Sequence, residues 1–248
     1  VHALSLTTGR ELWRFKGPGI VSGPPMPVSQ ADRAAVVYAD GTVVWLDVTT
    51  GEAKQTRRLP GGVTGPVLML GQTVCYGTAD RTVAAFDLDA AKTLWQKGTR
   101  IPVEQSMTST AGLVFVRFDE GKLLALSATD GELAWSFVAE GGRITAPATD
   151  DTRLYVATDT GLLCAFDARK GDPAWRVKLD GAVHVAPVVA GGRVYAGTES
   201  GTLWVLDATD GRVVWKTGLP GAPSAPVCVA GSRVLVSTQD GSLEAFER

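Results

Sequence analysis

The sequence predicts an all-β protein, and within that class a β-propeller of four-stranded antiparallel blades with about 40 residues each. One pattern recurs along the chain: TGLLCAFDARKGDPAW at 160–175 returns as SGTLWVLDATDGRVVW at 200–215. Short valine-rich runs alternate with turns that contain glycine, and a tryptophan closes most copies of the pattern. Periods of this length occur in propeller blades and in helical arrays, so the local pattern has to decide between them.

The repeat is aligned on the glycine of its turn. That position holds Gly9, Gly51, Ala91, Gly131, Gly171 and Gly211, spaced by 42 residues and then four times by 40. Four residues later stand Trp13, Gln55, Trp95, Trp135, Trp175 and Trp215. Gln55 and Ala91 depart from the pattern, which leaves the outer turns of the second and third units open.

Four strands are expected in each unit. In the sixth unit they are 183–190, 193–199, 202–208 and 212–218. The connections are Gly-Gly, Ser-Gly and Thr-Asp-Gly, in which glycine supplies the positive φ that tight hairpins need. Short apolar runs bounded by Gly, Asp, Thr and Pro are typical of strands and do not fit a helix.

Such units form a propeller because each sheet buries its faces against its neighbours in a ring. A single domain is therefore expected over 1–248, with units at roughly 1–16, 20–59, 62–98, 103–138, 143–179, 183–218 and 222–248. Seven blades are expected, with six or eight as alternatives, and the first and last blades are incomplete in this chain, so further strands are expected ahead of Val1. We expect the five tryptophans of the column to be structural, filling the space between blades.

The composition excludes several classes of protein. The net charge is −2, from 24 basic and 26 acidic residues, and no basic stripe suggests nucleic acid as a partner. No apolar run approaches the roughly 18 residues of a membrane helix. Cys75, Cys164 and Cys228 lie apart in apolar stretches, so we expect buried free thiols and no disulfide framework.

The runs ALSLTTGRELW (3–13), ALSATDGELAW (125–135) and VLDATDGRVVW (205–215) resemble the tryptophan-docking motif of the pyrroloquinoline-quinone-like propeller repeats. That family includes quinoprotein dehydrogenases, a lipoprotein of the bacterial outer-membrane barrel-assembly machinery, and sensor propellers attached to bacterial kinases. The resemblance covers the whole chain and is specific for the fold. It leaves the function open among these classes.

Catalytic and cofactor sites are not expected. The dehydrogenases of this family usually carry an adjacent cysteine pair and a calcium held by carboxylate and amide oxygens, whereas this chain has no Cys-Cys and no asparagine. With His2 and His184 as its two histidines, the chain cannot build a zinc site from several of them. We therefore expect no cofactor, no metal site and no enzymatic activity.

One sector breaks the repeat. Innermost strands carry a small residue followed by proline, but residues 103–110 read VEQSMTST, with Glu104 and Gln105 in that place. Arg117 stands where the other copies have small or apolar residues, and the next innermost strands add Arg143 and His184. These five residues are the candidate binding patch at the mouth of the channel; the alternative is an Arg117–Glu104 pair that serves the fold alone.

The favoured function is a non-catalytic scaffold that binds another protein or a peptide segment, of the outer-membrane assembly type. A ligand-sensing propeller of a bacterial signalling protein is the alternative, and a quinone-dependent dehydrogenase is a second one. The resemblance favours the periplasm or cell surface, whereas unpaired cysteines leave the cytoplasm possible. A monomer is expected.

Overall fold

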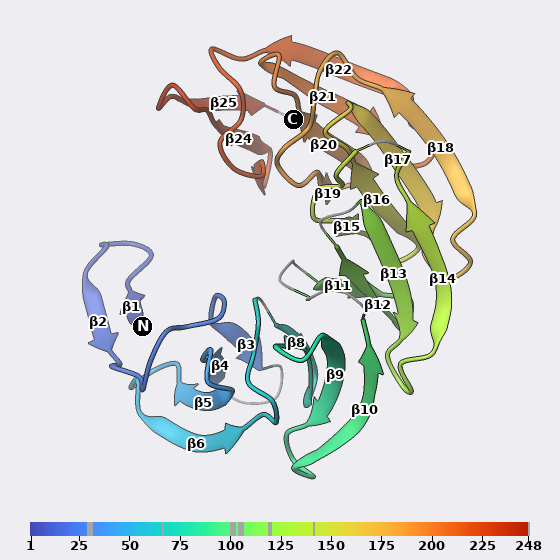
Figure 1. Cartoon of the computed structure of the whole chain (residues 1–248). Helices are drawn as coiled ribbons and strands as arrows, with labels where there is room; N and C mark the ends of the chain where they lie inside the picture. Colours follow the sequence, from blue (N-terminus) through green and yellow to red (C-terminus); the bar gives the residue numbers. More distant parts are fainter. Residues whose placement is uncertain are drawn as a thin grey trace. The chain divides into compact units, whose positions relative to one another are not determined.

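The computed structural model describes residues 1–28, 32–65, 67–99, 103, 107–118, 121–140 and 142–247, and every regular element in that part of the chain is a β-strand (Figure 1). The contacts divide the chain into two compact units. The first unit is Val1–Ser106 with Thr129–Gly131, and the second unit is Met107–Ala128 with Glu132–Arg248.

The first unit contains one two-stranded sheet and two four-stranded sheets. The two-stranded sheet is β1 (His2–Leu4) and β2 (Glu11–Arg14). The next sheet is β3 (Met26–Val28), β4 (Arg33–Val37), β5 (Thr42–Asp47) and β6 (Ala53–Arg58). The third is β7 (Leu68–Leu70), β8 (Thr73–Thr78), β9 (Thr82–Asp87) and β10 (Lys92–Gly98).

The second unit contains three four-stranded sheets and one three-stranded sheet. They begin with β11 (Met107–Thr110), β12 (Leu113–Arg117), β13 (Lys122–Ser127) and β14 (Leu133–Val138). The next is β15 (Ala148–Thr149), β16 (Arg153–Ala157), β17 (Leu162–Asp167) and β18 (Pro173–Lys178). Then come β19 (Val188–Ala190), β20 (Arg193–Gly197), β21 (Thr202–Asp207) and β22 (Val213–Gly218), and last β23 (Cys228–Ala230), β24 (Arg233–Ser237) and β25 (Leu243–Glu247).

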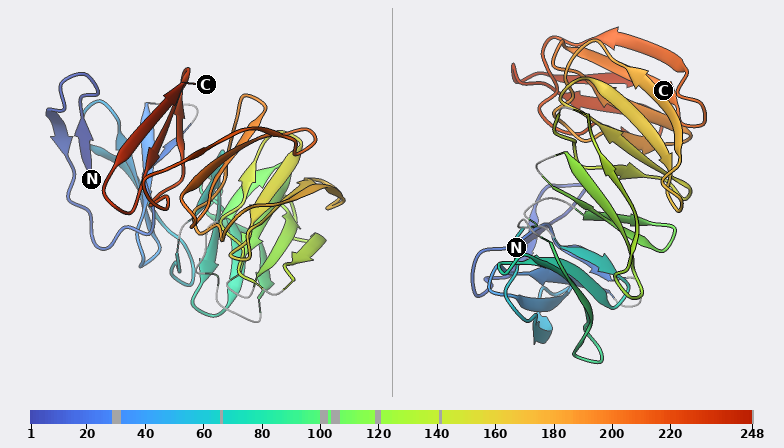
Figure 2. Two further views of the ribbon diagram at one scale, coloured as in Figure 1. Left: turned by 90° about the horizontal axis from the view of Figure 1, so that it is seen from above. Right: turned by 45° about the vertical axis from the view of Figure 1, so that its right-hand side comes forward.

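Within each sheet the strands follow one another in chain order and pair antiparallel (Figure 2). The expected four-stranded antiparallel units are therefore confirmed. The innermost strand of the sixth unit is shorter than predicted: β19 covers Val188–Ala190, whereas a strand over 183–190 was expected. Pro187 precedes β19 and has no N–H to offer a ladder, which explains where this strand begins.

The turn before each outermost strand combines a left-handed residue with an aspartate or, at Ser5 and Ser127, with a serine. Gly211 has φ +74°, and its N–H donates to the carbonyl oxygen of Asp207 at 2.9 Å. The Asp207 carboxylate accepts the N–H of Thr209 at 2.9 Å, and this hydrogen bond is the main cause that lowers the pKa of Asp207. Ala91, which replaces the glycine in the β9–β10 turn, has φ +51° and keeps the same backbone conformation.

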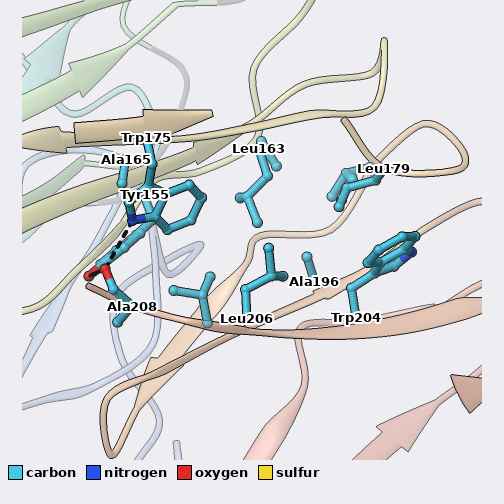
Figure 3. Close-up of a cluster of buried hydrophobic side chains, with 12 residues drawn as sticks. Tyr155, Leu163, Ala165, Trp175, Leu179, Ala196, Trp204, Leu206 and Ala208 are labelled. Carbon is cyan, nitrogen blue, oxygen red and sulfur yellow. Dashed lines mark hydrogen bonds between the residues drawn. The ribbon is translucent and has the colours of Figure 1, made fainter. Parts of the chain in front are cut away.

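The core of the second unit lies between adjacent sheets. Figure 3 shows the indole of Trp175, on the outermost strand β18, pointing at Ala208 just after β21. Its Nε1–H donates to the Ala208 carbonyl oxygen at 3.1 Å, and the Tyr155 hydroxyl oxygen lies 3.3 Å from the same carbonyl oxygen. Trp135 repeats the arrangement one sheet earlier, with its Nε1–H on the Ala168 carbonyl oxygen at 3.0 Å. The tryptophans thus join one sheet to the next by packing and by a hydrogen bond.

The sheet that lacks this tryptophan compensates for it. Elsewhere a small residue faces the tryptophan across the strand pair, in Ala3–Trp13, Ala85–Trp95, Ala125–Trp135, Ala165–Trp175 and Val205–Trp215. Opposite Gln55 stands Trp45, which is buried and belongs to the same core cluster as Phe86 of the next sheet. The large ring has moved from the outermost strand to its neighbour, so the substitution leaves an indole in this layer.

The cysteine prediction was right for two residues and wrong for the third. Cys75 and Cys164 are buried free thiols, and burial raises the pKa of Cys75 to about 12 and that of Cys164 to about 11. Cys228 is also free but is exposed, because it lies on β23 with its side chain on the solvent side. A short apolar run alone does not distinguish the two faces of a strand.

Candidate functional site

The candidate patch is described in part by the structure. Glu104 and Gln105 lie outside the described residues. Arg117, Arg143 and His184 all belong to the second unit, at the end of β12 and in the segments that precede β15 and β19. Each of the three is held by a different partner.

Arg117 reaches the neighbouring sheet. Its Nη1 donates to the carbonyl oxygen of Ile144 at 2.6 Å, and the side chain is half-buried. The corresponding position holds Gly77 in the first unit and Gly197 later in the second. A Cβ added at Gly197 would clash with Pro223 of the next sheet, so this position lies directly against its neighbour. Arg117 therefore makes a link between sheets, which is a structural role for one member of the patch.

Arg143 is exposed and is fixed through its main chain. Its N–H donates to Asp159 Oδ1 at 2.9 Å, and the N–H of Asp159 donates to the Arg143 carbonyl oxygen at 3.0 Å. Neither of these bonds uses the guanidinium group. The backbone of Arg143 is thus anchored on Asp159, while its side chain is exposed.

His184 is exposed and faces an acid. Its Nε2 lies 3.3 Å from Glu199 Oε2, with exposed side-chain fractions of 55% and 66%. Pairs this open to water contribute little to stability, at about 0–1 kcal/mol. The contact places a carboxylate next to the imidazole, so this part of the patch carries both a proton-binding group and a negative charge.

The backbone register separates Arg143 from His184 by two residues. Asp159 donates to the carbonyl of Arg143, whereas the matching Glu199 donates to that of Ala182, at 2.8 Å. Arg143 therefore corresponds to Ala182, and His184 corresponds to Thr145. The two basic residues come from the same end of adjacent sheets in this unit, but they are not equivalent positions of the repeat.

Sequence reasoning missed the column to which His184 belongs. At this position the main-chain N–H donates to the second strand of its own sheet, at 2.8 to 2.9 Å, in Ser22, Thr64, Thr145 and Ser224. All four side chains are small hydroxyls, and Glu104 and His184 fall in the same place by sequence. Aligning the innermost strands on the residue that follows Val63, Ile144 and Val183, instead of on their prolines, would have placed His184 in one column with these hydroxyl residues.

The chemistry available here is recognition by mixed charges. Asp159 and Glu199 lie beside the two basic residues, so the site offers acceptors as well as donors. Across the described ranges, no group of three or more His, Cys, Asp or Glu side chains gathers to hold a metal ion. Within the same ranges, no helix has the length and apolar character needed to cross a membrane.

Solved structures of the same architecture confirm the propeller. The crystal structure of BamB from Moraxella catarrhalis matches 97% of this chain and 89% of its own, with a TM-score of 0.55 and 19% identity. The computationally designed protein Ika8 matches 97% of this chain and 75% of its own, with a TM-score of 0.76 and 19% identity. Likeness at this identity shows the fold; the number of blades in a closed ring stays a prediction.

Sequence comparison identifies the family. A curated protein from Nitrosomonas eutropha, the outer membrane protein assembly factor BamB, is 32% identical over 140 residues. The match takes up 56% of this chain and 32% of that protein, so this chain spans about a third of the relative's length. The profile of the family described as outer membrane protein assembly factor BamB matches residues 1–146 and 137–247. The chain therefore belongs to the BamB family of pyrroloquinoline-quinone-like propellers.

Proposed function

We propose that this protein is a non-catalytic scaffold that binds other polypeptides during assembly of outer-membrane proteins in the bacterial cell envelope. The observation that carries the proposal is the match of the assembly-factor profile to 1–146 and 137–247, nearly the whole chain. The step from family to role is an analogy, since one fold serves many functions. The architecture supports it, because packed sheets offer edges and turns as rigid binding surfaces.

The candidate patch fits a protein partner better than a small anion. Arg143 and His184 are exposed, and each lies next to a carboxylate, of Asp159 and Glu199 respectively. Alternating charges of this kind match a polar peptide segment that carries both signs. We therefore propose that the segments before β15 and β19 contact the partner, with Glu104 and Gln105 as further contacts, while Arg117 supports the fold.

The test is made in the source organism with the full-length gene product. Deleting the gene should lower the amount of folded outer-membrane β-barrel proteins, measured by their heat-dependent shift on gels, and fractionation should place the protein in the periplasm or at the envelope. A tagged copy should capture outer-membrane assembly components, identified by mass spectrometry. Unchanged barrel proteins together with a cytoplasmic location would refute the proposal.

The alternative functions give different results. A ligand-sensing domain would show a thermal shift with a small metabolite and would not depend on an envelope partner. A quinone-dependent dehydrogenase would retain pyrroloquinoline quinone with calcium through gel filtration and oxidise alcohols with a dye acceptor. We expect neither result, and stoichiometric retention of the quinone would overturn the non-catalytic assignment.

A further inference from the structure

A cavity of about 210 Å³ lies in the second unit, between the end of β14 and the sheet β15–β18. Its walls include Phe137, Glu140, Thr160, Leu162, Cys164 and Arg176. Pockets for drug-sized ligands begin near 300 Å³, so this one suits a single large side chain. The lining is more apolar than polar, and it includes one carboxylate, of Glu140, and one guanidinium group, of Arg176.

The repeat itself contains the same place in a filled form. Cys164 and Trp204 are the third residues of β17 and β21, and they face Arg176 and Lys216 across their strand pairs. Trp204 follows Cys164 by forty residues, and Lys216 follows Arg176 by forty residues. Glu140 corresponds in the same way to Asp180, which follows Leu179 after β18.

In the sheet β19–β22 the indole of Trp204 occupies this place and is held by three contacts. Its Nε1–H donates to Asp180 Oδ1 at 3.0 Å. The ammonium group of Lys216 lies 4.5 Å from the centre of its ring, a cation–π contact. Its apolar edge lies beside Leu179, which Figure 3 shows next to the ring. Trp204 is consequently buried, at 8% exposed.

In the sheet β15–β18 the corresponding acid and cation are present and the ring is missing. Glu140 stands in the place of Asp180, Arg176 in that of Lys216, and the small thiol of Cys164 leaves the space open. We propose that this cavity is a recognition pocket for the indole side chain of a tryptophan on a partner polypeptide. The indole N–H would donate to the Glu140 carboxylate, and the ring would lie under the guanidinium group of Arg176.

The strand beside the cavity can hold the main chain of such a partner. β14 is the last strand of its sheet and reads LAWSFV, without a charged residue. The other last strands of four-stranded sheets, β6, β10, β18 and β22, each carry lysine or arginine. Charges on an edge strand discourage pairing with another chain, so β14 is the edge that lacks this protection.

Two apolar side chains of β14 face solvent: Leu133 is 57% exposed and Val138 is 59% exposed. Val138 also lines the cavity. An extended peptide that pairs with β14 can therefore place one side chain in the pocket while its backbone extends the sheet. That the partner is a polypeptide rests on the proposed function; the pocket for an indole rests on the comparison with Trp204.

Binding is tested on the whole purified chain with a fluorescein-labelled heptapeptide of alternating threonine and valine with a central tryptophan. A matched peptide carries alanine at the centre. In anisotropy titrations we expect the tryptophan peptide to bind at least about tenfold more tightly. Equal affinity for the two peptides, or no binding of either, would overturn the proposal.

Two pairs of variants locate the site. Cys164→Trp supplies the indole from within and should abolish the preference for tryptophan, whereas Cys228→Trp at the exposed thiol should retain it. Arg176→Gln should weaken the tryptophan peptide several-fold, and Lys216→Gln at the filled site should not. If Cys164→Trp fails to fold, the arginine pair decides alone; a preference that survives Arg176→Gln unchanged contradicts the pocket.

The peptide experiment is independent of the envelope experiment. Loss of peptide selectivity with normal capture of assembly components would refute the pocket and leave the scaffold. Normal peptide selectivity without any effect on outer-membrane proteins would refute the assembly role and leave the pocket.

Discussion

Trp175 donates its indole N–H to the carbonyl oxygen of Ala208 at 3.1 Å, and so ties the outermost strand of one sheet to the turn of the next. The Tyr155 hydroxyl oxygen lies 3.3 Å from the same carbonyl oxygen, and its ring lies 5.9 Å from that of Trp175. Two side chains of the preceding sheet thus pack at one carbonyl group. Contacts of this kind connect consecutive sheets where no backbone ladder joins them.

Truncation of this ring should cost much of the stability. Trp175→Ala removes a buried indole and leaves a cavity, so we expect the free energy of unfolding to fall by about 3–5 kcal/mol. Trp135→Ala should act in the same direction. Urea unfolding measures both, and Trp175→Phe, which keeps an aromatic ring but loses the N–H donor, should lie between the parent and Trp175→Ala, since the hydrogen bond is worth about 1 kcal/mol. Midpoints equal to that of the parent would refute the role of these rings.

The glycines of the outer turns should resist substitution for two separate reasons. Gly171 has φ +76°, and a Cβ there would lie 2.6 Å from Cδ2 of Trp135. Gly171→Ala should therefore lose about 1–2 kcal/mol through its backbone and more through the clash. Gly192→Ala is the matched control, because Gly192 has φ +71° with nothing within 4 Å of the added Cβ. An equal decrease in melting temperature in both variants would contradict the packing of Trp135 on this turn.

Acid should weaken the protein through Asp150. Burial opposes the ionisation of this carboxyl, but hydrogen bonds from the Tyr155 hydroxyl and the N–H groups of Thr152 and Arg153, at 2.6 to 2.7 Å, outweigh it and lower its pKa. A depressed pKa in the folded state gives stability that is present above the ordinary value of 3.8 and is lost as the pH falls through the folded value. The melting temperature should therefore decrease when the pH is lowered below about 4.

The matched variants for this prediction are neighbours in one turn. Asp150→Asn should be less stable than the parent at neutral pH, and the difference should shrink as the pH falls below about 4. Asp151→Asn, at an exposed position of the same turn, should follow the parent throughout. Parallel melting curves of Asp150→Asn and the parent at every pH would refute the assignment.

The strand pattern could be predicted because every unit repeats similar strand and turn sequences. Alternating valine-rich runs, Asp-x-x-x-Gly turns and the tryptophan column each depend on neighbours within about ten residues of sequence. Even the departures keep the local rule: Ala91 adopts the positive φ of the missing glycine, and Trp45 replaces the ring that Gln55 lacks. The second of these needs the strand register, which the sequence alone does not give.

The candidate site was harder to predict because it depends on contacts between sheets. Arg117 was grouped with Arg143 on sequence position, yet its guanidinium group meets the carbonyl of Ile144 across a sheet boundary. The cavity at Cys164 becomes visible when this residue is compared with Trp204 and Lys216 in three dimensions. The sequence signal that could have pointed to it is Trp204 itself, because the other copies hold Val44, Ala84, Leu124, Cys164 and Glu244 at this position.

The two arginines of the candidate patch should separate in experiment. Arg117→Ala leaves the Ile144 carbonyl oxygen without this donor in a half-buried place, so we expect a loss of about 1–3 kcal/mol. Arg143→Ala retains both main-chain bonds to Asp159, so its stability should stay within about 0.5 kcal/mol of the parent. If the patch binds the partner, Arg143→Ala should reduce capture of assembly components while Arg117→Ala, measured well below its melting temperature, should not. Equal loss of stability in both variants would refute the division of roles, and undiminished capture by Arg143→Ala would remove Arg143 from the binding surface.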